Sequence, residues 1–392
     1  MEIKFIASPF ITSDNKIDWN KIKVFAGECG GVCWSPTGFT KGESENDERK
    51  IKRADDNLKR GHHSVFDQVY IPMRLKGISR NLAMHINNEK QYSATEQSFR
   101  YTEPEEFLSE TDQKMYYKWK QRFSEIAERD YSDVFSKRDI RGFGSENARV
   151  FLGLNTKTSE GYTTSIRQLN YLAMMLAEEL KNPSSEATKI ILPEIEEFLS
   201  RLESQGALDN NLMKNNKQRR MSLYRGVLGK NEQFGNSFSM QLNCSNAALA
   251  EIQRHRSMSC RIVRPNGYYT SKPIIDNPEY HEEYDQDMKF MTDQHICLGS
   301  TNDIVIDGEL EAFTDSFLKE RLCRYALLEV EDTAKLMLSK YMDGTKETEP
   351  AIHEELKQYS HGSRCLSKRF HCPDSCGWDL AIKGERRVWE VN

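Results

Sequence analysis

The chain has 392 residues, 38% of them hydrophobic, which suits two domains of moderate size with real hydrophobic cores. Its formal net charge of -5 argues against a protein that coats nucleic acid, so we expect no nucleic-acid polymer as a partner. It has no apolar run that could span a bilayer, no signal-peptide pattern at its start, and nine cysteines that suit reduced thiols, so we expect a cytoplasmic protein that binds no membrane.

The first part of the chain predicts several helices and one strand. In chain order we expect a charged helix over Glu43–Arg60 ended by Gly61, a strand over Val65–Leu75, a helix over Ile78–Ile86, a charged surface helix over 105–135, and helices over Ile166–Leu180 and Glu194–Leu202. The following stretch, Ser204–Arg220, is polar, Asn-rich and basic, which favours an interdomain linker.

Beyond this stretch the same order of elements recurs. We expect a strand over Phe234–Leu242, a helix over Ala247–Arg256 and a long amphipathic helix over Phe317–Met342. The recurrence indicates a diverged internal duplication. We therefore predict one half over residues 1–205 and a second half, with a C-terminal tail, over 206–392.

Three motifs follow one another in the first half. They are Gly61-His62-His63-Ser64-Val65-Phe66-Asp67-Gln68, Gly77-Ile78-Ser79-Arg80 and Glu96-Gln97-Ser98-Phe99-Arg100-Tyr101. Together they resemble the flavin-dependent thymidylate synthase family, whose members carry a GHxSxFEH-like segment, GISR, an RHR triplet and an ExSxRY-like loop. The first half has Asn88-Glu89-Lys90 where the family has the triplet.

The second half keeps what the first half lacks. It has the triplet Arg254-His255-Arg256, but Arg264 stands in place of the loop serine. Two further arginines of the family are divided in the same way: Arg149 is present only in the first half and Arg321 only in the second. This complementary loss predicts one composite site built from both halves.

The resemblance implies an α/β fold of two similar halves, each a mainly antiparallel sheet with packed helices, arranged like a pseudo-dimer of the family. It also implies a homo-oligomer, a dimer of such pseudo-dimers. The implied reaction is the methylation of C5 of the pyrimidine nucleotide dUMP, with FAD as cofactor and methylenetetrahydrofolate and NADPH as co-substrates.

The resemblance also assigns roles to particular residues. The catalytic residues would be Arg149, Arg254 and Arg321. The substrate-binding residues would be these three with Glu96, Ser98, Arg100 and Glu251, and the cofactor-binding residues His62, Ser64, Asp67, Arg254, His255 and Arg256. Arginine suits phosphates and developing negative charge because its planar cation is permanent, and a cationic pair at His255 and Arg256 would suit an anionic reduced flavin.

Glu251 departs from the family, which has glutamine at this position. An ionised carboxylate only accepts hydrogen bonds, so it would repel a uracil carbonyl and favour an amino group. Either the nucleotide is not dUMP, or Glu251 is neutral, or it points elsewhere. Alternative functions are therefore methylation or hydroxymethylation of another nucleotide such as UMP or dCMP, or nucleotide binding by a catalytically inactive relative.

The C-terminal tail contains possible metal ligands. They are His361, Cys365, His371, Cys372 and Cys376. Thiolates and imidazoles at short spacing bind zinc, but this spacing matches no common zinc module. We therefore predict no metal site.

Overall fold

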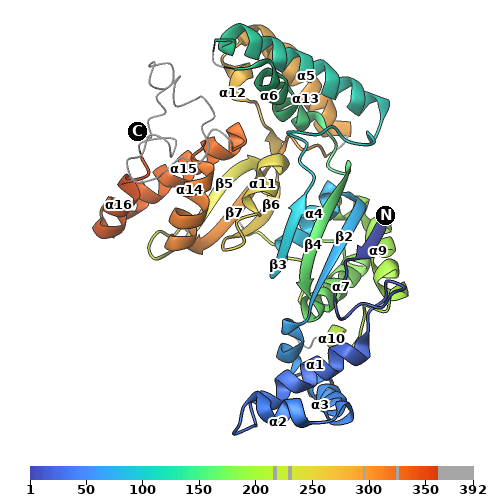
Figure 1. Cartoon of the computed structure of the whole chain (residues 1–392). Coiled ribbons are helices and arrows are strands. Elements are labelled where there is room, and N and C mark those ends of the chain that lie inside the picture. Colours follow the sequence, from blue (N-terminus) through green and yellow to red (C-terminus); the bar gives the residue numbers. More distant parts are fainter. Residues whose placement is uncertain (134, 215–218, 228–231, 295, 324–325, 361–392) are drawn as a thin grey trace. The chain divides into compact units, whose positions relative to one another are not determined.

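The computed structural model describes residues 1–133, 135–214, 219–227, 232–294, 296–323 and 326–360 (Figure 1). The chain divides into two compact units that are discontinuous in sequence. Unit 1 contains Met1–Gln97 and Lys157–Ser222, and unit 2 contains Ser98–Thr156 and Leu223–Asn392. Among the described residues, no helix has the length and apolar character needed to cross a membrane.

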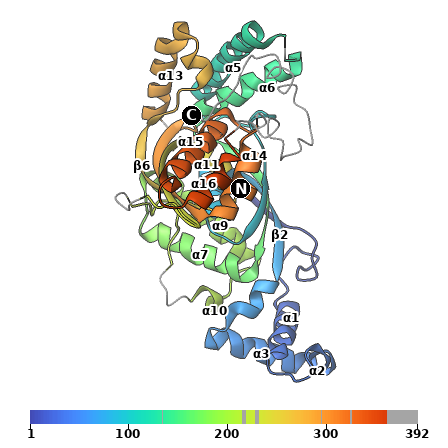
Figure 2. The ribbon, with the colours of Figure 1, turned by 90° about the vertical axis from the view of Figure 1, so that its left-hand side faces the viewer.

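Unit 1 is built around a four-stranded antiparallel sheet in the order β1-β2-β4-β3. Its elements are β1 (Glu2–Phe5), α1 (Trp19–Val32), α2 (Phe39–Ser44), α3 (Asp47–Arg60), the 3-10 helix η1 (His63–Gln68), β2 (Tyr70–Ser79), α4 (Arg80–Asn88), β3 (Tyr92–Glu96), β4 (Lys157–Ser165), α7 (Ile166–Lys181), α8 (Glu186–Ile190), α9 (Leu192–Ser204) and α10 (Asn210–Met213). Alternate residues of β2 enter the core, and α7 and α9 contribute apolar faces to it. Figures 1 and 2 show α1, α2 and α3 grouped at one end of this unit.

Unit 2 contains a three-stranded antiparallel sheet in the order β5-β7-β6. Its elements are α5 (Glu110–Tyr131), α6 (Lys137–Ala148), η2 (Arg149–Phe151), β5 (Ser237–Ser245), α11 (Asn246–Ile252), β6 (Ser259–Tyr268), α12 (Lys272–Ile275), η3 (Pro278–Tyr280), α13 (His281–Gln294), β7 (Ser300–Glu309), the π-helix η4 (Ala312–Leu318), α14 (Lys319–Arg321), α15 (Leu328–Thr345) and α16 (Pro350–Lys357). Within this unit, α5, α6 and α13 lie together in both views (Figures 1 and 2).

The predicted fold class, antiparallel sheets with packed helices in two similar halves, is confirmed. Strands β2, β3 and β4 of the first sheet can be compared in chain order with β5, β6 and β7 of the second. In both sheets the last strand of the three, β4 or β7, lies between the other two. Ser79 at the end of β2 and Ser245 at the end of β5 both cap the helix that follows. Each of these serines also donates its backbone N–H to a carboxylate, from Glu194 and from Glu329.

Segments 150–154 and 296–299, one from each predicted half, also pair with each other inside unit 2. Gly153 and Cys297 form an antiparallel bridge. On one side of it, Leu154 N donates to Ile296 O at 2.7 Å, and on the other, Leu298 N donates to Leu152 O at 2.7 Å. Such reciprocal bonding is the pattern of a two-fold interface, here formed within one chain.

The predicted boundaries need several corrections. The strand expected from Val65 begins at Tyr70, because Val65–Gln68 form a 3-10 helix that buries Phe66. The segment around 105–135 is not simply a surface helix, since α5 buries Trp119 completely against the aromatic rings of Phe151 and Tyr284.

Two further corrections concern the second part of the chain. The helix expected over Ala247–Arg256 ends at Ile252, so the triplet follows it rather than forming its last turn. The long helix expected over Phe317–Met342 is divided, because α14 ends at Arg321 and α15 begins at Leu328.

The expected linker is packed against unit 1. Within Ser204–Arg220, Ala207 and Leu212 are fully buried in the core of this unit. The chain passes into unit 2 after Ser222. The division into two sequence halves at residue 205 stays a prediction about ancestry. The compact units are divided differently, because segment 98–156 of the predicted first half belongs to unit 2.

Candidate functional site

The side chain of Glu251 lies between two arginines of unit 2. Its Oε1 accepts a hydrogen bond from Arg149 Nη2 at 2.8 Å, and its Oε2 lies 3.8 Å from Arg321 Nη1. The side chains of Glu251 and Arg321 are each 18% exposed and that of Arg149 is 8% exposed. The carboxylate therefore presents an acceptor with a guanidinium near each of its oxygens.

Glu251 is ionised in this setting. Burial raises the pKa of its carboxyl group, but the charges of Arg149, Arg100 and Arg321 outweigh burial and hold the pKa below its ordinary value. Of the three sequence-based explanations for Glu251, a neutral side chain is therefore excluded. Nor does Glu251 point away from the predicted site, because its partners are predicted site residues.

Local structure explains why Glu251 is placed there. Ser245 caps α11 by accepting a hydrogen bond from Ala248 N through its Oγ. Glu329 of α15 fixes this cap, since its carboxylate oxygens accept from Ser245 N and Ser245 Oγ. Burial raises the pKa of Glu329 to about 7 despite these hydrogen bonds and the charge of Arg149. The pairing of α15 with the start of α11 thus sets the position of Glu251 on the last turn.

Arg100 extends the cluster of charges. Its Nε and Nη2 donate to Glu146 Oε2 at 3.1 and 2.9 Å, and both side chains are about nine-tenths buried. Burial lowers the pKa of Arg100, but the negative charges of Glu146 and Glu251 raise it by more. The pKa therefore lies above its ordinary value, and the guanidinium stays charged. Ser98, two residues earlier, accepts from Arg100 N through its Oγ at 3.4 Å and so shapes the turn that carries this arginine.

His255 contacts Arg321 rather than acting as a second cation. Arg321 Nε donates to His255 Nε2 at 2.6 Å. Burial, with the nearby charge of Arg321, lowers the pKa of His255 to about 3. The ring is neutral at physiological pH and supplies no positive charge, which differs from the cationic role expected from the sequence. Flavin binding by His255 itself stays a prediction.

Two buried polar atoms of this cluster have no hydrogen-bond partner among the described residues. They are Arg149 Nε and Glu146 Oε1. Buried polar groups are nearly always paired, so each such atom calls for a water molecule or a ligand group. A donor and an acceptor on neighbouring turns fit a small polar ligand such as a nucleotide.

The cluster joins residues from both predicted halves within one compact unit. Arg100 and Arg149 come from the first half, and Glu251 and Arg321 come from the second. The sequence did not single out Glu146, although it lies one helical turn before Arg149. Of the triplet, Arg256 is exposed and Arg254 is half-buried, and their predicted roles stay predictions.

The other predicted residues lie in unit 1. Glu96 forms an ion pair with Arg80, 2.7 Å between Oε1 and Nη1. His62 and Ser64 are exposed at η1, while Asp67 accepts from Ser165 Oγ at 3.1 Å and from Arg167. The flavin-binding roles of His62, Ser64 and Asp67 and the substrate-binding role of Glu96 stay predictions.

A basic aromatic cluster adjoins η1. The guanidinium carbon of Arg167 lies 5.1 Å from the ring centre of Tyr171, and that of Arg219 lies 5.3 Å from it. His63 Nδ1 lies 3.4 Å from the hydroxyl of Tyr171. Such a surface suits an anionic dinucleotide, which agrees in chemistry with the flavin expected at this loop.

Asn88 and Glu89, which belong to the vacated triplet Asn88-Glu89-Lys90 of the first half, have a structural role. Glu89 Oε1 accepts from Ser222 Oγ at 2.7 Å and also from Ser222 N, and Asn88 Nδ2 donates to Ser222 Oγ at 2.7 Å. Ser222 is the last residue of unit 1. The former triplet position therefore fixes the chain where it leaves this unit.

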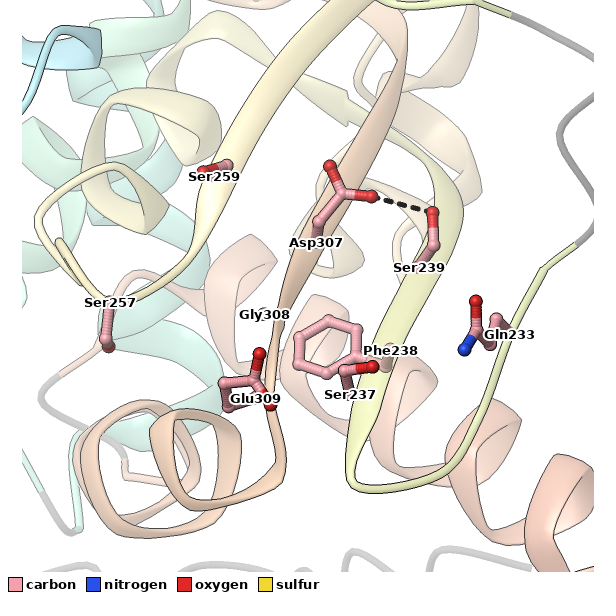
Figure 3. Close-up of a pocket in the computed structure, with 9 residues that line it drawn as sticks. All are labelled: Gln233, Ser237, Phe238, Ser239, Ser257, Ser259, Asp307, Gly308 and Glu309. Atoms are coloured by element: carbon pink, nitrogen blue, oxygen red, sulfur yellow. Dashed lines mark hydrogen bonds between the residues drawn. The ribbon is translucent and has the colours of Figure 1, made fainter.

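A pocket of about 450 Å³ opens on the second sheet (Figure 3). Its lining residues are Gln233, Ser237, Phe238, Ser239, Ser257, Ser259, Asp307, Gly308 and Glu309. In its wall, Ser239 Oγ of β5 donates to Asp307 Oδ1 of the neighbouring strand β7 at 2.8 Å. The lining contains two carboxylates and no lysine or arginine, so it does not suit a nucleotide phosphate. We place the candidate site instead at the arginine cluster, which consists of Arg100, Arg149 and Arg321 with Glu146 and Glu251.

No group of His, Cys, Asp and Glu suited to a metal is present among the residues that the structure describes. The C-terminal set from His361 to Cys376 lies outside the described residues.

Comparison with known proteins gives a partial match to one family model. Residues 21–197, fewer than half of the 392, match the family model described as thymidylate synthase complementing protein. The resemblance drawn from the motifs is confirmed over this segment. The match to the thymidylate synthase complementing proteins includes Arg100 and Arg149 and ends before Glu251 and Arg321. No curated protein sequence matches the chain.

Two solved structures are similar at low identity. Thymidylate synthase X from Helicobacter pylori, crystallised with FAD and dUMP, is 19% identical with a TM-score of 0.32, and the match covers 55% of this chain and 100% of that one. The UMP/dUMP methylase PolB from Streptomyces cacaoi, bound to 5-Br dUMP, is 13% identical with a TM-score of 0.31, and the match covers 53% and 96%.

Proposed function

We propose that this protein is a flavin-dependent enzyme that alkylates C5 of a uracil nucleotide, dUMP in the first place. The proposal is carried by the ionised Glu251 between Arg149 and Arg321. This array offers donor, acceptor and donor in turn. The edge of uracil offers the complement, with N3–H between the two carbonyl oxygens O4 and O2.

This array also replaces the remaining explanation, that the nucleotide is not dUMP, because a uracil carbonyl need not face the carboxylate. A carboxylate flanked by guanidinium groups meets N3–H, while the carbonyl oxygens meet the arginines. Cytosine would place its unprotonated N3 against the carboxylate and its amino group against an arginine, which are two mismatches. The geometry thus favours dUMP or UMP and disfavours dCMP.

The same residues suit the chemistry at C5. When hydride or another nucleophile adds at C6 of the ring, negative charge develops on O4 and C5, and C5 can then attack an electrophilic carbon. A fixed guanidinium in a buried setting stabilises such charge more strongly than water does. Arg149 or Arg321 would serve this role, with Glu251 holding the ring by N3–H. Arg100 and Ser98 would face the phosphate, with Arg254 as a further substrate contact.

FAD is the proposed cofactor. The proposed flavin contacts are His62, Ser64 and Asp67 and, separately, Arg254, His255 and Arg256. The Arg167–Tyr171–Arg219 surface beside η1 fits the pyrophosphate of FAD. When bound, flavin supplies the redox step, with NADPH as reductant and methylenetetrahydrofolate as carbon donor. We further propose a cytoplasmic homo-oligomer, a dimer of pseudo-dimers.

The test compares dUMP with N3-methyl-dUMP and dCMP by calorimetry. N3-methyl-dUMP cannot donate to Glu251, so we expect wild type to bind it at least about 10-fold more weakly than dUMP, with dCMP weaker by a similar factor. In Glu251→Ala the discrimination against the N3-methyl group should largely disappear. Equal affinity of wild type for dUMP and dCMP would contradict the proposed array.

Flavin binding separates an enzyme from an inactive nucleotide-binding relative. We expect bound FAD to be detected by its absorbance and to be weakened by Arg256→Ala. Tight dUMP binding without any flavin signal after titration with FAD would favour the inactive relative.

A further inference from the structure

The imidazole of His255 lies between two polar side chains that follow one another on the same segment. Its Nε2 accepts from Arg321 Nε at 2.6 Å, and its Nδ1 lies 3.2 Å from Ser316 Oγ. The side chain is 2% exposed. Phe317 packs edge-to-face on the ring, with centroids 5.1 Å apart. The ring is therefore held on both nitrogens and on its face.

These contacts define one protonation state. An arginine only donates, so His255 Nε2 must carry its lone pair. The neutral ring then carries its proton on Nδ1 and donates it to Ser316 Oγ. Glu320 lies 4.0 Å from both His255 Nε2 and Arg321 Nη2, but its side chain is 60% exposed and competes weakly.

The two partners of the imidazole come from consecutive helical segments. Ser316 lies in the π-helix η4, and Arg321 ends α14, which follows η4 directly. In a regular α-helix, residues five positions apart point about 140° apart. This segment departs from a regular α-helix, and both side chains contact one imidazole.

We infer that His255 is a positioning residue, which orients the Arg321 guanidinium toward Glu251 and the pyrimidine. With Nε committed to His255, the plane of the guanidinium is fixed, and Nη1 is the nitrogen directed to Glu251 Oε2. Ser316 fixes the tautomer on which this depends. The inference rests on the proposed function, since it names how one donor of the uracil-binding array is held.

The test uses three variants and one control from the same segment. His255→Phe keeps a ring against Phe317 but removes the acceptor, and we expect dUMP affinity to fall about 10-fold or more. His255→Gln places an amide oxygen near the position of Nε2 and should stay within about 3-fold of wild type. Ser316→Ala should fall between them. Asp315→Asn should bind as wild type does, because the exposed carboxylate of Asp315 pairs with Lys319 and with no site residue among the described residues.

A second measurement does not depend on nucleotide binding. Nitrogen-15 NMR of labelled histidine should show His255 protonated on Nδ1, with no titration between pH 5 and 8. A proton on Nε2, titration in this range, or wild-type dUMP affinity in a folded His255→Phe variant would overturn the inference. Failure of wild type to bind any uracil nucleotide would instead contradict the proposed function, and urea unfolding of each variant shows whether it folds.

Discussion

At the scale of single residues, the ion pair of Arg149 and Glu251 is both a candidate substrate contact and a structural liability. Both groups are largely buried, so removing Arg149 takes the hydrogen-bonded counterion from a buried carboxylate and leaves it the more distant Arg321. We expect Arg149→Met to lower the free energy of unfolding by about 3 kcal/mol. Arg149→Met combined with Glu251→Gln should recover part of this loss. Urea unfolding measures both, and strictly additive losses would show that the pair does not interact.

A buried histidine of unit 1 predicts acid sensitivity. His85 is fully buried, with Nδ1 2.8 Å from Asn81 O and Nε2 3.0 Å from Thr188 Oγ1. Burial lowers its pKa to about 4, from 6.5 in the unfolded chain. Between these values the unfolded chain binds a proton that the folded chain does not, so stability falls as pH falls. From pH 7 to 5, wild type should lose about 2 kcal/mol more than His85→Gln in urea unfolding.

The residues of the site differ in how far the sequence could predict them. Arg100, Arg149, Glu251 and Arg321 stand at family motif positions, and the structure brings them together. Ser316 belongs to no motif, and its contact with His255 lies in a π-helical segment that leaves no clear pattern in the sequence. The neutral state of His255 follows from burial beside Arg321, which a sequence does not show.

At the scale of elements, helical periodicity predicted α7 almost to its ends, because an amphipathic helix needs only its own spacing. Helical periodicity failed where tertiary contacts determine where a helix ends. Arg321 ends α14 beside His255, so the apolar pattern that continues from Phe317 is interrupted. Strand β4 was not predicted, because it lies in the centre of the first sheet and its Thr, Ser and Gly residues give a weak apolar signal.

The vacated triplet gives a prediction at this scale. The carboxylate of Glu89 accepts hydrogen bonds from the backbone N–H and the hydroxyl of Ser222. Glu89→Ala should therefore lower the free energy of unfolding by about 1–3 kcal/mol. It should leave dUMP affinity unchanged once the protein is folded. Arg254→Ala, at the retained triplet, should do the reverse and weaken dUMP with little loss of stability. Weakened dUMP binding in a folded Glu89→Ala variant would show that the first triplet position still serves a nucleotide.

At the scale of the whole molecule, the two compact units do not follow the two sequence halves. Helices α5 and α6 belong to the predicted first half but to unit 2, and Lys118 and Trp119 of α5 both donate to Asp287 of α13. No periodicity in the sequence indicates that segment 98–156 joins unit 2, since the residues that it packs against lie far away in the chain. The placement of this segment puts Arg100 and Arg149 in the same unit as Glu251 and Arg321, and so completes one arginine cluster per chain.

The stoichiometry of dUMP binding tests this central claim most directly. Because each half lacks what the other keeps, one chain should offer one site. Calorimetric titration should saturate near one dUMP per chain, and Arg100→Ala and Arg321→Ala should each abolish the same binding event although they come from different halves. Two equivalent nucleotides per chain, or full binding after loss of either arginine, would contradict the composite site.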